Sequence, residues 1–332
     1  MIAFIVRRLV GAVGLLLIIS AVTFGIFFLV PKAAGVTSDD LAARFAGKTP
    51  DAATLEAIKD RFALDEPVPV QYGKYIKSIV AGDTYDTGVE TIDCPAPCLG
   101  YSFRTNQPVF DEIVDRAPVT FMIAIGAAVL WLLAGITIGV VSALRRGSVI
   151  DRVSMGIALA GVSLPVFFTG LLSLAFVVHR WQLLPEVNYR GFSDNPFSLL
   201  LPWICLAFLY AALYARLTRA GMLETMNEDY IRTARAKGLP ERTVVVKHGL
   251  RATLTPIMTV FGLDFGLLLG GAIITERTFS LPGIGQLALD GIYQSDLPVV
   301  LGATMVVALF VVLANLIVDI LYGVVDPRVR HS

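Results

Sequence analysis

Six apolar segments, each long enough to cross a membrane as a helix, constrain this chain more than any other feature. Four of them contain no Asp, Glu, Lys or Arg: residues 9–31, 117–144, 153–178 and 195–215. Two more contain a single charged residue each: residues 252–275, with Asp264, and residues 297–325, with Asp319. A helix needs about 20 apolar residues to cross roughly 30 Å of hydrocarbon. We therefore predict an all-α polytopic membrane protein with six transmembrane helices.

The composition agrees with a membrane protein and argues against other classes. Hydrophobic residues make up 55% of the 332 residues and charged residues only 16%, whereas about 25% charged residues are usual in soluble domains. So apolar a chain is also not disordered. The 27 Lys and Arg balance 27 Asp and Glu, which leaves no net basic field to attract nucleic acid. We expect membrane lipid around the chain and no nucleic-acid partner.

The Lys and Arg residues are divided unevenly among the segments that join the spans. With a cytoplasmic N-terminus, the cytoplasmic segments carry 15 Lys and Arg, whereas the short outer loops carry three. Short cytoplasmic loops are enriched in these residues. Both termini are therefore predicted to face the cytoplasm. Eight of the 15 lie between Arg216 and Arg251.

The first loop is long enough to fold as a separate part. Residues 32–116 carry nine Lys and Arg and 14 Asp and Glu, and residues 55–64 have the pattern of a short amphipathic helix. We predict an extracytoplasmic domain at 32–116. The chain is thus predicted to have four parts: an N-terminal transmembrane helix at 1–31, this domain, a five-helix transmembrane core at 117–325 and a cytoplasmic tail at 326–332.

Two cysteines lie close together in this outer loop, in the sequence Cys94-Pro-Ala-Pro-Cys98. Extracytoplasmic compartments are oxidising, so we predict a disulfide between them. A metal pair is the weaker interpretation, because two thiols without a nearby His supply too few ligands for a closed zinc site. Cys205 lies in the fourth span and is interpreted as a small apolar side chain.

Motifs for nucleotide hydrolysis and for common hydrolytic chemistry are absent from the sequence. It has no Gly-x-x-x-x-Gly-Lys-Ser/Thr loop, no His-Glu-x-x-His pair and no Gly-x-Ser-x-Gly turn. These motifs supply phosphate binding, a zinc site and a serine nucleophile respectively. We therefore expect no catalytic residues and no cofactor or metal bound by this chain. A transporter, channel or assembly subunit fits better than an enzyme.

The loop between the fourth and fifth spans, residues 224–251, has the pattern of two short helices. A helix is predicted from Asp229 to Lys237, with Asn227 as its N-terminal cap and Gly238 as its C-terminal stop. Pro240 suits the start of a second helix. The loop is then a rigid protruding knob on the cytoplasmic face. An ordinary basic loop is the alternative that these residues leave open.

Residues 229–238, Asp-Tyr-Ile-Arg-Thr-Ala-Arg-Ala-Lys-Gly, resemble the "EAA" coupling loop of binding-protein-dependent ABC importer permeases. The form is that of the oligopeptide/dipeptide (OppB/DppB-like) family. Further blocks similar to this family occur in the expected order: residues 64–72, 145–152, 163–165, 276–285 and 315–322, followed by Asp326-Pro327-Arg328. Two stretches depart from its pattern. Val30-Pro31-Lys32 stands where a Pro-Gly-Asp-Pro stretch is usual, and residues 83–101 are extra sequence.

The resemblance implies a type I ABC importer permease fold in a bacterial cell membrane. It implies import of di- or oligopeptides, driven by ATP and Mg²⁺ in two partner ATPase subunits rather than in this chain. The other implied partners are a second homologous permease subunit and an extracytoplasmic substrate-binding protein. Alternatives are the same machinery for a nickel chelate, haem, glutathione or another small solute and, with less support, a membrane enzyme or assembly factor.

The resemblance also implies site residues. Those expected to couple to the ATPase are Glu228, Asp229, Tyr230, Arg232, Thr233, Ala234, Lys237 and Gly238. Ala234 and Gly238 correspond to the second Ala and the Gly of the motif, whereas Arg232 and Thr233 replace its Glu and first Ala. Those expected to dock the binding protein are Glu276, Phe279, Pro282 and Gly283, ahead of a short helix at 286–293.

Three polar residues within the spans are candidates for the translocation pathway or its gate: Asp264, Asn315 and Asp319. An ionised carboxylate within a membrane is costly unless it meets water or a partner. Asp264 is either a structural carboxylate bonded to a neighbouring helix or a pathway residue that senses a peptide amine. Asn315 and Asp319 share one helix face with Tyr322, which favours a packing or gate network over direct substrate contact.

Small residues and a proline suggest how the spans pack. Gly135-x-x-x-Gly139 and Gly266-x-x-x-Gly270 permit close approach of neighbouring helices. Pro165 lies inside the third span and is expected to kink that helix.

Overall fold

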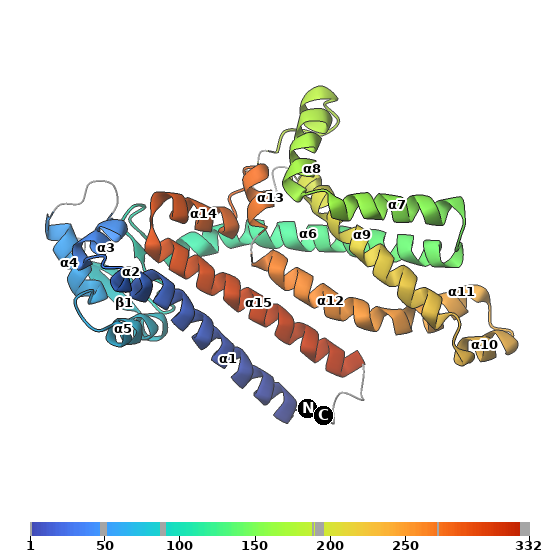
Figure 1. Cartoon of the computed structure of the whole chain (residues 1–332), viewed down its shortest axis with the longest axis horizontal. Helices are drawn as coiled ribbons and strands as arrows, with labels where there is room; N and C mark the ends of the chain where they lie inside the picture. The colour runs from blue at the N-terminus through green and yellow to red at the C-terminus, as the bar shows by residue number, and fades with distance from the viewer. Residues whose placement is uncertain are drawn as a thin grey trace. The chain divides into compact units, whose positions relative to one another are not determined.

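The computed structural model of the chain describes residues 2–46, 52–86, 91–187, 189, 196–270 and 272–325. Long helices dominate it (Figure 1). In the described part, five are long and apolar enough to cross a membrane: Val6–Ala33, Val109–Leu144, Phe197–Thr225, Glu241–Leu269 and Leu297–Ile317. A pair of shorter apolar helices, Val149–Ser163 and Val166–Arg180, is bent by 103° at the break between them. With this pair counted as one span, the six predicted spans are all present.

The chain divides into two compact units. The N-terminal unit comprises Ile2–Thr120 and Pro282–Leu313, and the central unit comprises Phe121–Leu281 and the chain from Ala314 onward. Each unit has its own internal packing.

The N-terminal unit begins with helices that pack around a pair of phenylalanines. These elements are α1 (Ile2–Phe24), a π-helical turn (Gly25–Leu29), α2 (Val30–Ala33), α3 (Ser38–Ala46), α4 (Ala52–Phe62) and α5 (Val68–Ala81). The rings of Phe24 and Phe28 stack with centroids 4.1 Å apart, and both are buried with Leu41 and Ile58. The helix predicted at 55–64 is confirmed as α4, which begins three residues and ends two residues earlier.

Two small antiparallel sheets follow α5, and they add strands to the predicted all-α class. β1 (Asp83–Asp86) pairs with β2 (Thr91–Cys94), and β3 (Tyr101–Ser102) pairs with β4 (Gln107–Pro108). A disulfide joins Cys94 to Cys98, with Cα atoms 5.5 Å apart. Both cysteines are buried against Tyr85 and Tyr101. The predicted disulfide is confirmed.

Mass spectrometry of unreduced, alkylated protein is expected to recover a peptide bridged between Cys94 and Cys98. The bridge closes a short loop whose sulfurs are shielded by aromatic rings, so mild reductant should open it only slowly. Cys205, which is buried and free, is the internal control and should be alkylated only after unfolding. Alkylated Cys94 or Cys98 in the unreduced sample would contradict the assignment.

Three long-range elements complete the N-terminal unit. The first part of α6 (Val109–Leu144), α14 (Ile284–Gln294) and the first part of α15 (Leu297–Val325) share a buried cluster that includes Val109, Ile284 and Val299. The backbone N–H of Ile284 donates to Thr120 Oγ1 at 2.9 Å. The short helix predicted at 286–293 is confirmed as α14.

The central unit is built from helices that connect end to end. They are the rest of α6, α7 (Val149–Ser163), α8 (Val166–Ser173), a π-helical segment (Leu174–Arg180), a 3₁₀ turn (Pro196–Leu199), α9 (Leu200–Thr225), α10 (Asp229–Ala236), α11 (Glu241–Thr243), a second π-helical segment (Val244–Leu250), α12 (Arg251–Leu269) and α13 (Ile273–Thr278). The last part of α15 also belongs to this unit. In Figure 1, α10 and α11 lie at the far end of α9.

The third predicted span differs from its expectation. The chain does bend at Pro165, but the prediction of a kink within one continuous helix is wrong. The chain leaves the helical conformation at two successive residues. Leu164 has ψ 126° and Pro165 has ψ 141°, both extended. Proline disfavours helical geometry in the residue before it as well as removing its own N–H donor. Both effects together produce the break between α7 and α8.

The two glycines of Gly135-x-x-x-Gly139 bring α6 into close contact with α9. A Cβ atom at Gly135 would lie 2.6 Å from Tyr214 Cβ, and one at Gly139 would lie 2.5 Å from Thr218 Cβ and 2.7 Å from the Ala215 carbonyl oxygen. These distances leave no space for a side chain. The predicted close approach is confirmed for this pair.

Replacing Gly139 by valine should destabilise the protein, because its side chain would collide with the backbone of α9. Overpacking of this kind typically costs about 1–3 kcal/mol. The measurement is the melting temperature of the purified protein in detergent. Gly156→Val on α7 is the matched control, because a Cβ atom there meets nothing within 4 Å. Equal melting temperatures for both variants would contradict the packing argument.

Candidate functional site

The loop that resembles a coupling motif forms a helix, a tight turn and a second helix. We call residues 229–243 the knob. α10 ends at a turn in which Gly238 has φ +76°, and its N–H donates to the Arg235 carbonyl at 2.9 Å. Such a left-handed turn favours glycine, which has no Cβ to strain it. Pro240 precedes α11, as predicted.

The predicted N-terminal cap of α10 is wrong. Glu228, with extended backbone, occupies that position and makes no side-chain cap. Asn227 lies one residue too early, still in the turn that ends α9, and its side-chain amide donates to the Leu223 carbonyl at 2.7 Å. The Asn227 side chain is therefore held at the end of α9 and does not cap α10.

One face of the knob is buried. Ile231, Ala234 and Val244 form a cluster with Met226 packed against it. Ile231 and Val244 are completely buried. Because these apolar side chains belong to α10 and to the π-helical segment after α11, they fix both helices together. The knob is thus packed rather than a flexible basic loop.

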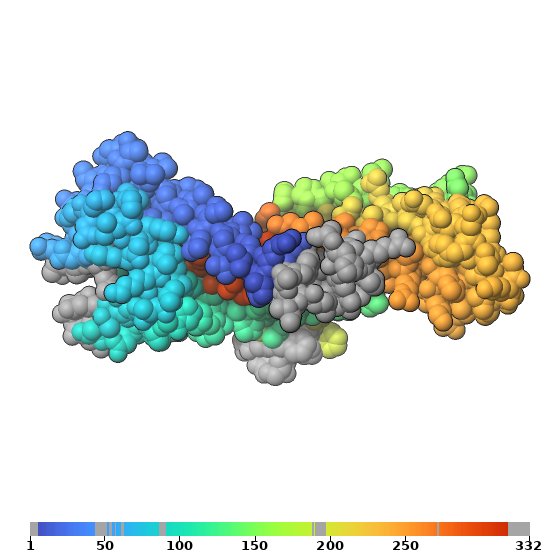
Figure 2. Space-filling view, turned by 90° about the horizontal axis from the view of Figure 1, so that it is seen from below, coloured from blue at the N-terminus to red at the C-terminus, as the bar shows by residue number. Residues whose placement is uncertain are grey.

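The opposite face of the knob is exposed. Tyr230 is 46% exposed and Leu239 is 38% exposed, and a Cβ atom at Gly238 would meet no atom within 4 Å. Figure 2 shows the gold and orange atoms of this part of the chain uncovered at one end of the view. Exposed aromatic and apolar side chains with charged neighbours are typical of surfaces that bind another protein.

Charged side chains reinforce the turn of the knob. Arg235 donates two hydrogen bonds to Glu241, with Nη2 2.7 Å from Oε1 and Nε 3.2 Å from Oε2. Arg232 pairs with Asp229 at 3.3 Å within α10. Both pairs are exposed, so each adds little to stability. The Arg235–Glu241 pair spans the turn at Gly238, whereas the Arg232–Asp229 pair lies within the first turns of α10.

The same unit contains a buried carboxylate, Asp151, to which the sequence analysis assigned no role. Asp151, at the start of α7, accepts from Arg219 Nε at 2.7 Å and Arg219 Nη2 at 2.8 Å. It also accepts from Ser142 Oγ at 2.5 Å and from the Gly147 N–H at 2.9 Å. The three residues that make these four hydrogen bonds lie on α6, on the following turn and on α9. This clamp fixes three helices at one end of the unit.

One local signal could have indicated the clamp. Ser148 and Asp151 have the spacing of a capping box, and the Asp151 N–H donates to Ser148 Oγ at 3.2 Å. That pattern places Asp151 in the first turn of α7. It does not identify Arg219, which is 68 residues further along the chain.

Asp264 lies nearer the end of its helix than the sequence suggests. α12 ends at Leu269, so Asp264 is five residues from that end rather than at mid-span, because the chain leaves the helix at Gly270 before α13. The Tyr214 hydroxyl donates to Asp264 Oδ2 at 2.9 Å. Asp264 therefore does bond a neighbouring helix, which was one of the two interpretations.

The other pathway candidates are less completely described. Asn315 is half-buried in α15. Asp319 lies in the same helix, but its side chain and that of Tyr322 are outside the described side chains. Among the described residues, no hydrogen bond joins Asn315 to Asp264.

The four residues expected to dock a binding protein differ in exposure. Pro282 is exposed, whereas Glu276, Phe279 and Gly283 are buried. Phe279 packs against α8, where a Cβ atom at Gly170 would lie 3.4 Å from its ring. Arg277 and Ser280 are the exposed neighbours of the buried pair.

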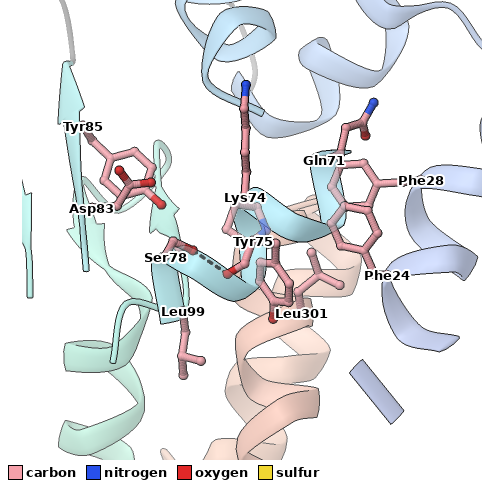
Figure 3. A pocket seen from close by; sticks show the side chains of 12 residues that line it. Phe24, Phe28, Gln71, Lys74, Tyr75, Ser78, Asp83, Tyr85, Leu99 and Leu301 are labelled. Atoms are coloured by element: carbon pink, nitrogen blue, oxygen red, sulfur yellow. Dashed lines mark hydrogen bonds between the residues drawn. The ribbon is translucent and has the colours of Figure 1, made fainter. Parts of the chain in front are cut away.

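A small cavity in the N-terminal unit is too small for a peptide. Its volume is about 40 Å³, whereas pockets for organic ligands usually enclose about 300–1,000 Å³. Figure 3 shows Tyr75 beside Leu301 on one side of it and Asp83 with Tyr85 on the other. A space of this size holds water molecules. We therefore do not assign substrate binding to it.

Comparisons with known proteins match two family models and full-length relatives. Residues 135–331 match the family "Binding-protein-dependent transport system inner membrane component", and residues 1–124 match the corresponding N-terminal family. The chain is 35% identical over 332 residues to the glutathione transport system permease protein GsiC of Pectobacterium atrosepticum. It is 35% identical over 360 residues to the dipeptide transport system permease protein DppB of Escherichia coli K12. Both alignments cover 100% of each protein. The chain therefore belongs to the family of inner membrane permease components of binding-protein-dependent ABC importers.

Proposed function

We propose that this permease subunit carries di- or oligopeptides into the cytoplasm. Its family membership is the single observation that carries the transport role. The substrate class is supported by the relatives, one of which transports dipeptides by name. Glutathione, which is itself a tripeptide, is the second candidate because another relative is named for it.

The proposed mechanism assigns the knob to a partner ATPase. The proposed coupling surface consists of the residue just before the knob and seven residues within it: Glu228, and Asp229, Tyr230, Arg232, Thr233, Ala234, Lys237 and Gly238. Two ATPase subunits bind ATP and Mg²⁺ and close against each other. Their movement is transmitted through the knob to the membrane helices as a rigid-body change. The packed face around Ile231 supports this role, because a rigid element transmits force better than a flexible loop.

The proposal includes a second homologous permease subunit and a substrate-binding protein. The pathway runs between the two permeases and is lined on this side by Asp264, with Asn315 and Asp319 as a gate. The binding protein docks on the segment that contains Glu276, Phe279, Pro282 and Gly283. In that segment Pro282 is the exposed contact, and the buried Glu276 and Phe279 hold its shape.

The proposed orientation places both termini and the knob in the cytoplasm and residues 32–116 outside. Arg146→Cys and Val80→Cys test it, since both positions are exposed. A membrane-impermeant maleimide should label the cysteine at 80 in intact cells and the cysteine at 146 only after permeabilisation. Labelling at 146 in intact cells would overturn the orientation.

The function itself is tested in vesicles that contain the complete importer with its binding protein. ATP-dependent uptake of labelled trialanine and labelled glutathione is the measurement. We expect uptake of at least one of them that requires both ATP and the binding protein. ATP-dependent uptake of neither compound, from a complex that assembles and hydrolyses ATP, would overturn the peptide assignment.

A further inference from the structure

A carboxylate without a basic partner lies among the membrane-spanning helices of the central unit. Asp264 on α12 is half-buried, and α12 packs along α9 (Figure 1). Among the described residues, no Lys, Arg or His forms an ion pair with it. Ionisable residues inside membrane spans are expensive, and they are retained where they line a pathway or meet a specific partner.

The hydrogen bond from Tyr214 satisfies only part of this carboxylate. The hydroxyl of Tyr214 reaches Oδ2 at 2.9 Å, and Tyr214 itself is completely buried. An ionised carboxylate offers about four acceptor positions on its two oxygens. Tyr214 therefore holds Asp264 in a fixed place from the protein side, and the remaining acceptor positions are available to another donor.

Aromatic rings pack around Tyr214, the partner of Asp264, with the Trp131 ring 6.1 Å from the Tyr214 ring. Trp131 on α6 is completely buried, and its ring lies 4.6 Å from that of Tyr210 and 6.0 Å from that of Phe261. Phe261 in turn stacks on Phe265 at 5.3 Å. Phe261 and Phe265 lie on the same helix as Asp264, three residues before it and one after it. These rings pack on one another and so fix the surroundings of Tyr214, and the carboxylate of Asp264 is the group there that favours a positive charge.

From this arrangement we infer that Asp264 binds the α-ammonium group of the peptide during its passage. The inference rests on the proposed function and names the group that this side of the pathway recognises. Dipeptides, oligopeptides and glutathione all carry a free α-ammonium group. The contact is a charge-assisted hydrogen bond, and it involves no covalent step.

A purely structural role for Asp264 makes the opposite prediction for two conservative variants. Asp264→Asn keeps an acceptor for the Tyr214 hydroxyl but removes the negative charge. Tyr214→Phe removes the hydrogen bond but keeps the charge. If Asp264 serves only to hold α9 against α12, the first variant is tolerated and the second is not. If it binds an ammonium group, the order is reversed.

The experiment measures uptake of trialanine and glutathione by vesicles with the complete importer. The binding protein selects the solute before it reaches the permease, so an effect at Asp264 belongs in kcat rather than in KM. We expect Asp264→Asn to lower kcat for both compounds by about tenfold, the factor that about 1.4 kcal/mol of lost interaction produces. Tyr214→Phe should lower it by less than threefold, and Asp264→Glu should retain most of the uptake.

Two further measurements separate the possible failures. The amount of chain in the membrane and its co-purification with the ATPase show whether each variant folds. If Asp264→Asn does not fold, Asp264→Ser, which also removes the charge, repeats the test. Normal kcat for Asp264→Asn, or a loss confined to Tyr214→Phe, would overturn the inference while leaving peptide transport intact. If the unaltered importer takes up neither compound, the proposed function fails and the inference falls with it.

Discussion

Replacing Gly238 by leucine is expected to lower uptake by at least about a hundredfold, because the turn of the knob disfavours a residue with a side chain and that side chain would enter the proposed ATPase contact. A branched residue at φ +76° is disfavoured by roughly 1–2 kcal/mol. A Cβ atom there meets no atom of this chain, so the leucine side chain would project from the turn into the proposed ATPase contact. Co-purification of the ATPase should fall together with uptake.

Gly238→Asn is the matched control for this variant. Asparagine adopts left-handed backbone geometry more readily than other residues with a side chain, and its side chain is shorter and polar. We expect it to retain a large part of both ATPase association and uptake. If Gly238→Leu keeps wild-type ATPase association and uptake, residues 229–243 are not the coupling surface.

Replacing Arg219 by methionine should have the second largest effect, and it should appear as a loss of folded protein. The change removes two hydrogen bonds and the countercharge from Asp151, which is 5% exposed. An uncompensated buried charge is strongly destabilising. We expect the melting temperature in detergent to fall by about 10 °C, and uptake to fall with the yield of folded chain.

Arg216→Met on the same helix is the control, because Arg216 is exposed and should tolerate the change. The combined variant Asp151→Asn with Arg219→Met is expected to be more stable than Arg219→Met alone, since no charge is then left without its partner. A double variant that is as unstable as the sum of both single changes would show that the clamp does not act as a pair.

Features determined by short stretches of sequence could be predicted. The spans follow from the lengths of uncharged runs, and the Cys94–Cys98 disulfide from two cysteines four residues apart in one loop. The stop at Gly238 follows from the conformational freedom of a single residue. The break at Pro165 was predicted only as a kink, because the loss of the proline N–H was considered and the effect of proline on the residue before it was not.

Contacts between distant helices could not be predicted in the same way. Asp151 with Arg219, and Tyr214 with Asp264, are pairs separated by 68 and 50 residues. The sequence around each of these residues does not indicate which helices will be neighbours in the fold. The glycines at 135 and 139 indicate that α6 approaches some helix closely, but the identity of α9 as that helix is a property of the packing.

The π-helical segment Val244–Leu250 between the knob and α12 sets a rotational phase. Each residue of an α-helix turns the chain by about 100°, and a π-turn accommodates more residues per turn than an α-turn does. Every side chain of α12 is therefore rotated relative to the position it would have if α11 continued as a regular α-helix. Asp264 faces Tyr214 in this phase. Converting Val244–Leu250 to α-helical geometry without changing its length would turn Asp264 away from that partner, so the π-helical geometry of this segment matches the direction of the knob to the direction of the carboxylate.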